Sequence, residues 1–200
     1  MLDRFYPIVP DSAWLGRIVP VGVKTVQLRI KDAPEEETSR QIVEALEICR
    51  HYHCQLIVND YWRIAISVGA DYIHLGQEDL AAADLAAIKA ARIKLGISTH
   101  SRQELEIALA AKPDYVALGP IYETKLKKMK WAPQGLARLQ EWKSEVSCPL
   151  VAIGGLTVEN AQDVISAGAD SLAVVTDIVT HPTPEMRVGA WLSDVGLKNP

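Results

Sequence analysis

Short runs of apolar residues recur along this chain and alternate with longer stretches in which apolar residues repeat at helical spacing. The runs are rich in Val, Ile and Leu and show no strict apolar–polar alternation, which is typical of parallel strands covered on both faces. They occupy residues 5–9, 25–30, 55–59, 72–76, 93–98, 115–119, 150–154 and 171–176. We therefore predict eight parallel strands.

The stretches between the runs carry helix signals. Ile42, Ala45 and Cys49 recur at helical spacing after an acidic segment that complements a helix N-terminus. The first helix is predicted around residues 12–20, and it is the least regular because Pro20 interrupts it. Each predicted strand is thus followed by a connection with helical character.

A strand followed by a helix, eight times in one chain, indicates an α/β fold of the (β/α)8 or TIM-barrel type. The main alternative is an open doubly wound sheet, which would carry a glycine-rich fingerprint after its first strand, whereas residues 10–14 read PDSAW. We expect residues 1–200 to form one TIM-barrel domain, with a frayed C-terminal tail from about residue 195.

Composition and net charge limit the classes of partner that this chain is expected to bind. The chain has 200 residues, of which 48% are hydrophobic and 23% charged, and this is ordinary globular composition. The net charge of -4 and the lack of a run of ~18 apolar residues argue against nucleic acid and membrane partners. Three scattered cysteines and no visible targeting segment favour a cytoplasmic protein. The oligomeric state stays open, and a homo-oligomer is one alternative.

The C-terminal ends of barrel strands carry the active site in TIM barrels. Gln27, Arg29 and Lys31 alternate at the end of the second strand, so we expect them to point together toward the barrel mouth, either for ligand binding or in a structural hydrogen-bond network. The third strand ends in Asn59 and Asp60, just before a helix. Both residue types are common N-caps, so capping is the leading interpretation of this pair alone.

A second carboxylate, Asp79, follows the next strand and is expected on the same rim as Asp60. Hard oxygen ligands from separate loops suit Mg²⁺, which usually keeps several waters and shares substrate phosphates. The structural alternative is that each aspartate only caps a helix.

Anion-binding features follow the sixth and seventh predicted strands. Gly154 and Gly155 precede a helix that begins near Thr157, where exposed N–H groups attract phosphate. The loop after the sixth strand contains a basic run, which is usually a solvated surface but here lies on the predicted active rim. Its members are Lys125, Lys127, Lys128 and Lys130.

Other chemistries find little support in the sequence. His74 lies inside the fourth predicted strand, where a packed and hydrogen-bonded histidine is expected rather than a metal ligand. No HxH, HExxH or Cys/His set indicates zinc. No Ser-His-Asp set can be assembled.

The motifs QLRIK, LIVND, YIHLGQED, GISTH, DYVALGPIYETKLK, PLVAIGGLTVEN and AGADSLAVVT occur in that order. With them, the chain closely resembles the thiamine-phosphate synthase family over about residues 5–180. The resemblance implies a TIM barrel that joins 4-amino-5-hydroxymethyl-2-methylpyrimidine diphosphate to 4-methyl-5-(2-phosphoethyl)thiazole or its carboxylated form. It also implies Mg²⁺ and a dissociative reaction, in which pyrophosphate leaves and the thiazole nitrogen captures a pyrimidine-methyl cation.

Matching positions give the expected site. The resemblance implies Mg²⁺ ligation by Asp60 and Asp79 and catalytic roles for Ser98 and Lys127. Phosphate of the thiazole substrate is expected near Gly155. The full set of expected substrate-binding residues is Tyr6, Gln27, Arg29, Lys31, Asn59, Ser98, Thr124, Lys127, Gly155, Val175 and Thr176.

Two positions depart from the family pattern. The family usually reads Thr-x-Thr-Lys in the loop after the sixth strand, whereas residues 124–127 read TKLK, so Leu126 removes a hydroxyl. Asp177 adds a negative charge beside Thr176 and the proposed phosphate site; it could point outward or cap the next helix.

Three alternatives remain. A thiazole tautomerase of the same fold carries a catalytic histidine after the sixth strand, where this chain has Gly119 and Pro120. Another phosphate-binding barrel, such as an isomerase or epimerase, is compatible with the fold alone, but Asp60, Asp79 and the lysine loop argue against it. A non-catalytic binder of thiamine precursors would hold ligand without releasing pyrophosphate.

Overall fold

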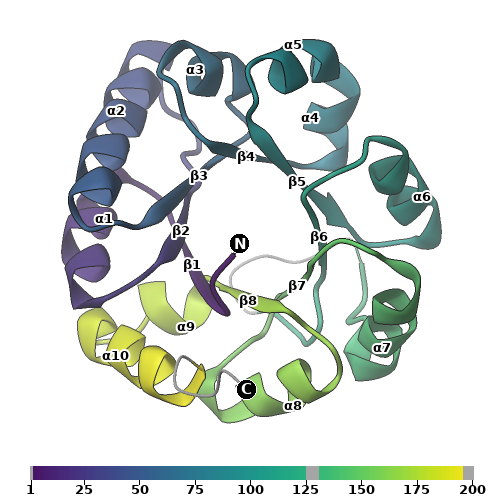
Figure 1. The fold of residues 1–200 in the computed structure, drawn as a ribbon. Helices are drawn as coiled ribbons and strands as arrows, with labels where there is room; N and C mark the ends of the chain where they lie inside the picture. The colour runs from purple at the N-terminus through teal and green to yellow at the C-terminus, as the bar shows by residue number, and fades with distance from the viewer. Residues whose placement is uncertain (1, 125–130, 196–200) are drawn as a thin grey trace.

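The computed structural model describes residues 2–124 and 131–195. Eight parallel strands close into a barrel in chain order, with helices around it (Figure 1). The predicted (β/α)8 fold is confirmed. The strands are β1 (Phe5–Val9), β2 (Thr25–Leu28), β3 (Gln55–Asn59), β4 (Tyr72–Leu75), β5 (Lys94–Thr99), β6 (Tyr115–Leu118), β7 (Leu150–Ile153) and β8 (Ser171–Val174).

The helices surround the strands and cover the outer face of the barrel (Figure 1). Where a helix around residues 12–20 was expected, α1 ends at Ile18 and Pro20 lies in a 3₁₀ turn. The helical elements are α1 (Ser12–Ile18), η1 (Val19–Val21), α2 (Glu35–His51), α3 (Trp62–Ser67), α4 (Gln77–Ala82), α5 (Leu85–Ala90), α6 (Arg102–Ala110), α7 (Gly135–Glu145), η2 (Val158–Asn160), α8 (Ala161–Ser166), α9 (Thr176–Val179) and α10 (Pro184–Val195).

Closure of the barrel pairs β1 with β8, so that Tyr6 lies opposite Ala173. Both faces of the strands are buried: one faces the helices and the other faces the barrel interior. This explains why the strands read as continuous apolar runs rather than as alternating ones. Burial of a large apolar side chain here contributes roughly 2–3 kcal/mol.

Alternate strand residues divide the core in two. On the outer side, Phe5 stacks on Trp191 of α10, with ring centroids 5.3 Å apart. On the inner side, Tyr6, Tyr72 and Tyr115 form an aromatic cluster inside the barrel. Polar side chains therefore share the barrel interior with tyrosine rings.

Some strands are shorter than the sequence indicates. β2 ends at Leu28, so Arg29 and Lys31 lie beyond it, while Gln27 stays within the strand. Gln27 faces the barrel interior, whereas Arg29 and Lys31 follow the strand end toward the mouth. The tail predicted to fray lies largely in residues 196–200, outside the described part of the chain.

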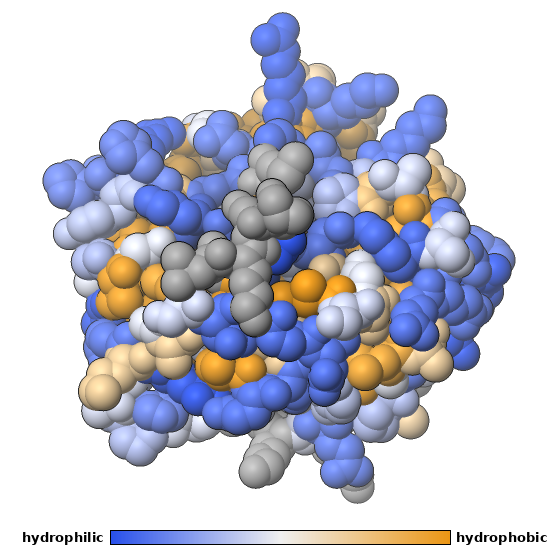
Figure 2. Space-filling view, turned by 60° about the horizontal axis from the view of Figure 1, so that its bottom comes forward, coloured by the Kyte–Doolittle hydropathy of each residue, from blue (hydrophilic) through white to orange (hydrophobic). Residues whose placement is uncertain are grey.

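The visible surface is mainly hydrophilic, with hydrophobic residues in separate small patches (Figure 2). Met186 is the most exposed large hydrophobic side chain of the described residues, at 72%. No helix within residues 2–124 and 131–195 is long and apolar enough to cross a membrane.

Candidate active site

Two carboxylates meet at the mouth of the barrel. Asp60 follows β3 and Asp79 lies in the first turn of α4, and both line a cleft of about 400 Å³. Lys31 Nζ donates to Asp60 Oδ2 over 2.9 Å. Burial, followed by the nearby negative charge of Asp60 and its hydrogen bond, raises the pKa of Asp79. The pair therefore carries negative charge that Lys31 only partly offsets.

Asp60 owes its position to the backbone. Its φ of 65° lies in the left-handed region, which costs a non-glycine residue free energy but which aspartate tolerates better than most. Its N–H donates to the His74 carbonyl over 2.9 Å, which ties the β3 end to β4. The left-handed turn delays the next helix, so that Tyr61 is the N-cap residue of α3.

The capping interpretation of Asn59 and Asp60 is therefore wrong. The N-cap residues are Tyr61 for α3 and Gly76 for α4, and neither makes a side-chain capping hydrogen bond. Asn59 is 4% exposed, and its Nδ2 has no hydrogen-bond partner among the described residues. A buried amide without a partner costs free energy, which a bound ligand with an acceptor would recover.

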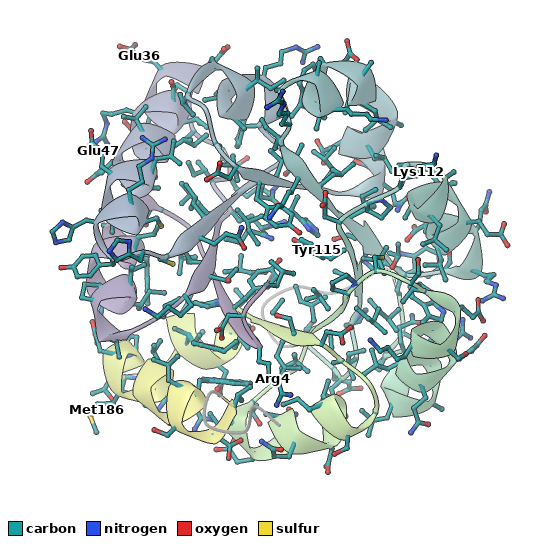
Figure 3. The ribbon with its side chains drawn as sticks, viewed as in Figure 1. Arg4, Glu36, Glu47, Lys112, Tyr115 and Met186 are labelled. Carbon is teal, nitrogen blue, oxygen red and sulfur yellow. The ribbon has the colours of Figure 1, made fainter. Side chains whose placement is uncertain are left out.

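A chain of hydrogen bonds crosses the barrel interior beneath the mouth. Gln27 Nε2 donates to Tyr6 Oη over 2.7 Å, and Tyr6 Oη lies 3.0 Å from Tyr115 Oη. Tyr115 Oη lies 2.7 Å from His74 Nδ1, and His74 Nε2 lies 2.7 Å from Ser98 Oγ. We call these five side chains the barrel relay. Figure 3 shows Tyr115 within the ring of strands, whereas Glu36, Glu47 and Met186 lie on the surrounding helices.

Burial controls the charge states in the relay. Burial is the largest cause that lowers the pKa of His74 to about 4; the charge of Asp60 opposes it, and Arg29 and His100 contribute in the same direction as burial. The imidazole is therefore neutral at pH 7. Burial also raises the pKa values of Tyr6 and Tyr115, so both phenols stay protonated.

Gly96 makes room for the relay. A Cβ at Gly96 would lie 2.1 Å from the Tyr115 ring, which is impossible without displacing it. The glycine in β5 thus lets Tyr115 of β6 lie across the barrel and stack on His74, with ring centroids 5.5 Å apart.

On the opposite side of the mouth, glycines bring two loops together. Gly154 and Gly155 have φ values of 98° and 69°. A Cβ on Gly155 would lie 2.6 Å from the Glu123 carbonyl, so only glycine fits between the loops after β7 and β6. Asn160 Nδ2 donates to the Gly155 carbonyl over 3.1 Å. The expected helix start near Thr157 takes the form of a 3₁₀ turn with a capping box.

The structure decides where Asp177 points. Arg187 donates to it through Nε (2.8 Å) and a terminal nitrogen (2.9 Å), and Trp191 Nε1 donates over 2.8 Å. Arg187 also reaches Glu159 over 2.8 Å. Asp177 is therefore neutralised and directed toward α10. Val175 and Thr176 stand at the start of α9, immediately before it.

The remaining predicted site residues lie around the mouth or outside the described part of the chain. Arg29 and Lys31 are exposed at the mouth, beyond β2. Thr124 lies at the edge of the described residues, and Lys127 and Leu126 lie outside them. Next to this gap, Trp131 stacks on His100 with a centroid separation of 6.1 Å.

A family model described as thiamine monophosphate synthase matches residues 6–178. This chain belongs to the thiamine monophosphate synthase family. The resemblance inferred from the strand-end motifs is confirmed.

Relatives and solved structures agree with this membership. A thiamine-phosphate synthase of Rhizobium etli is 60% identical over 193 residues, covering 96% of this chain and 95% of that one. One of Salmonella paratyphi B is 48% identical over 174 residues, covering 86% and 82%. The structure of a thiamine phosphate pyrophosphorylase from Pyrococcus furiosus superposes with a TM-score of 0.85 at 26% identity, covering 96% and 95%.

Sequence reasoning about this synthase-family site named Tyr6, Gln27 and Ser98 but missed two members of the barrel relay. Tyr115 was not singled out, and His74 was expected to be packed and hydrogen-bonded, as it is, but without a role in the site. Strand alternation carries a partial signal, because Tyr115 and His74 occupy inward-facing positions beside polar inward-facing residues on neighbouring strands. The bonding across the barrel has no signal in the local sequence.

Proposed function

We propose that this protein condenses 4-amino-5-hydroxymethyl-2-methylpyrimidine diphosphate with 4-methyl-5-(2-phosphoethyl)thiazole, or its carboxylated form. The products are thiamine phosphate and pyrophosphate, with CO₂ in addition when the carboxylated thiazole is used. Family membership supports this reaction. The observation that carries the proposal is the Asp60–Asp79 pair beside Lys31 in one cleft at the barrel mouth.

The donor set of the cleft fits Mg²⁺. No group of three or more His, Cys, Asp and Glu side chains in residues 2–124 and 131–195 could hold a metal ion. Two carboxylates suffice for Mg²⁺ that keeps waters and takes phosphate oxygens from the substrate. Burial first, and then the nearby charge of Asp60, raises the pKa of Asp79, and a bound cation would offset both. Asp60 and Asp79 would hold the ion, which would supply charge stabilisation to the departing pyrophosphate.

The other residues at this side bind and orient the pyrimidine diphosphate. Lys31 pairs with Asp60 but is about half exposed, so its ammonium is available to a diphosphate in the mouth. The unpartnered Asn59 amide and the partly exposed Ser98 hydroxyl face the pyrimidine. Arg29 adds positive charge at the mouth, while buried Gln27 and Tyr6 act from beneath.

The reaction needs no protein nucleophile. Loss of pyrophosphate leaves a pyrimidine-methyl cation, and the lone pair of the thiazole nitrogen forms the new C–N bond. The protein must hold the leaving group, align the two rings and limit access of water to the cation.

The second substrate is assigned to the opposite side of the mouth. The backbone at Gly155, Val175 and Thr176 would hold the phosphate of the thiazole, and Thr124 and Lys127 would complete its surroundings. Support comes from the neutralisation of Asp177 by Arg187, which removes a charge that would repel phosphate.

Formation of both products is the direct test. Purified protein with both substrates and Mg²⁺ should release pyrophosphate and form thiamine phosphate in equal amounts. Omission of either substrate should abolish thiamine phosphate formation. A folded protein that binds the pyrimidine diphosphate yet forms no thiamine phosphate would contradict the proposal and favour a binder.

The tautomerase alternative requires a catalytic histidine that this chain lacks at the matching position. Its catalytic histidine would stand after β6, where this chain has Gly119, and a Cβ there would lie 2.6 Å from Ile153. A side chain of any size is thus excluded from that position without rearrangement.

We also place the reaction in the cytoplasm, since all three cysteines are free thiols.

A further inference from the structure

The barrel relay has a direction that follows from its donors and acceptors. A phenol has one proton, a neutral imidazole has one N–H, and an amide nitrogen donates but does not accept. The structure turns the amide nitrogen of Gln27 toward Tyr6. The Tyr6 oxygen therefore accepts from Gln27, and its own proton goes to its other neighbour, Tyr115.

The remaining links follow in order. Because Tyr115 accepts from Tyr6, its proton goes to His74 Nδ1. With Nδ1 accepting, the single N–H of the neutral imidazole lies on Nε2 and donates to Ser98 Oγ. Ser98 thereby receives one hydrogen bond from below and keeps its own proton for the barrel mouth.

The opposite assignment at His74 conflicts with this amide orientation. If His74 Nδ1 carried the proton, Tyr115 would accept from it and donate to Tyr6. The Tyr6 proton would then have no acceptor among the described residues. Water could not accept it either, because Tyr6 is only 1% exposed. A buried donor without an acceptor is costly, so every donor is used only when the relay runs from Gln27 to Ser98.

We propose that the relay from Gln27 through Tyr6, Tyr115 and His74 fixes Ser98 as a hydrogen-bond donor toward a ring-nitrogen acceptor of the substrate. Tyr115 and His74 are then positioning residues for the pyrimidine. The proposal rests on the proposed function for the identity of the ligand, but the direction of the relay is a property of the ligand-free protein.

The direction has a kinetic consequence. A donor to a ring nitrogen binds the neutral pyrimidine at least as well as the electron-poor cation that forms later. The relay therefore contributes to binding and orientation rather than to stabilisation of the cation. Weakening it should raise KM for the pyrimidine diphosphate, leave KM for the thiazole phosphate unchanged and change kcat little.

The tautomer of His74 in the unmodified protein is the first test. Nitrogen-15 NMR of the histidine side chains, without substrates, distinguishes a protonated from an unprotonated ring nitrogen. The signals of His74 are assigned by their loss in His74→Gln. We expect the proton on Nε2 at pH 7. A proton on Nδ1 would mean that the Gln27 amide is turned and the relay runs backward, which would overturn the proposal.

A pair of matched variants tests the role of the relay. Tyr115→Phe removes one hydroxyl from it, whereas Tyr72→Phe removes a hydroxyl from the neighbouring ring, whose centroid lies 5.6 Å away, without touching the relay. Tyr115→Phe should shift the Nδ1 resonance of His74 and raise KM for the pyrimidine diphosphate about fivefold. Tyr72→Phe should leave both values at those of the unmodified protein.

The outcomes separate the proposal from the proposed function. If Tyr115→Phe and Tyr72→Phe change KM equally, or not at all, in an active enzyme, the positioning role is overturned. If the unmodified protein forms no thiamine phosphate but His74 carries its proton on Nε2, the proposed function fails while the direction of the relay stands. The tautomer is measured on the unmodified protein, and His74→Gln serves only to assign the signals.

Discussion

The β3–β4 side of the barrel mouth and the β7–β8 side, which lie across the ring from each other in Figure 1, treat their carboxylates in opposite ways. Asp60 and Asp79 are left close together, and burial and this proximity raise the pKa of Asp79. Asp177, beside the proposed phosphate site, receives two hydrogen bonds from Arg187 and one from Trp191.

This difference follows the charge that each side is proposed to receive. Under-compensated carboxylates create a place for a cation, and they raise the free energy of the ligand-free fold. A neutralised carboxylate does not repel an anion, and it also ties α9 to α10. Function and stability should therefore respond in opposite ways to the same chemical change on the two sides.

The largest expected effect is on turnover at the cation side. Asp79→Asn keeps the shape of the side chain but removes a proposed Mg²⁺ ligand, so turnover should fall about 100-fold. The melting temperature should stay the same or rise slightly, because the repulsion of Asp60 is removed. Steady-state kinetics and thermal unfolding measure the two effects. Normal turnover with a lowered melting temperature would assign Asp79 a structural role.

The matched change at the anion side should have the reverse pattern. Asp177→Asn removes the charge that Arg187 and Trp191 bind, so the free energy of unfolding should fall by about 2 kcal/mol. Turnover of the folded fraction should change little, since Asp177 points toward α10. Denaturant unfolding combined with kinetics checks this. A large loss of turnover without a loss of stability would break the comparison between the two sides.

A smaller effect is expected from pH on the stability contributed by the ion pair of Arg187 with Glu159. The hydrogen bond from Arg187 lowers the pKa of Glu159 from 4.5 to about 2. A lowered acid pKa stabilises the fold above pH 4.5, and this contribution is lost as the pH falls toward 2.

The contribution of this ion pair can be tested with Glu159→Gln. The unmodified protein should be more stable than Glu159→Gln by less than about 1 kcal/mol at neutral pH, because Glu159 is mostly exposed and screened by solvent. The difference should shrink as the pH falls below 4.5. A difference that is constant from pH 7 to 3 would show that the charge of Glu159 contributes nothing.

The smallest effect is expected at Lys31. Its ion pair with Asp60 is about half exposed on the lysine side, so Lys31→Met should change the free energy of unfolding by no more than ~0.5 kcal/mol. Lys31→Met should also raise KM for the pyrimidine diphosphate, and this increase, expressed as a free energy, should be larger than the loss of stability. A stability loss without a KM change would show that Lys31 serves the fold only.

The fold was predictable because a parallel barrel buries both faces of each strand, which makes the strands visible as apolar runs. The meeting of Asp60 and Asp79 was predictable for a related reason: both follow neighbouring strands, and such strand ends share one rim. The N-cap interpretation of Asp60 was wrong because its left-handed backbone starts the helix one residue later.

Features that join distant segments were not predictable. The direction of Asp177 depends on Arg187 and Trp191, which approach only when α10 packs beside α9. The relay needs β5 to carry Gly96 so that Tyr115 of β6 can reach His74 of β4. Neither the secondary-structure propensity of a segment nor the spacing of its residues indicates how distant segments pack together.

The central claim is that the cleft at the β3–β4 side uses its carboxylates to hold Mg²⁺ while pyrophosphate leaves. The most direct measurement is pyrophosphate release as a function of Mg²⁺ concentration for the unmodified protein, Asp79→Asn and Asp177→Asn. We expect release that requires Mg²⁺, a much weaker Mg²⁺ response in Asp79→Asn, and an unchanged response in folded Asp177→Asn. Equal Mg²⁺ dependence in all three proteins would contradict the account.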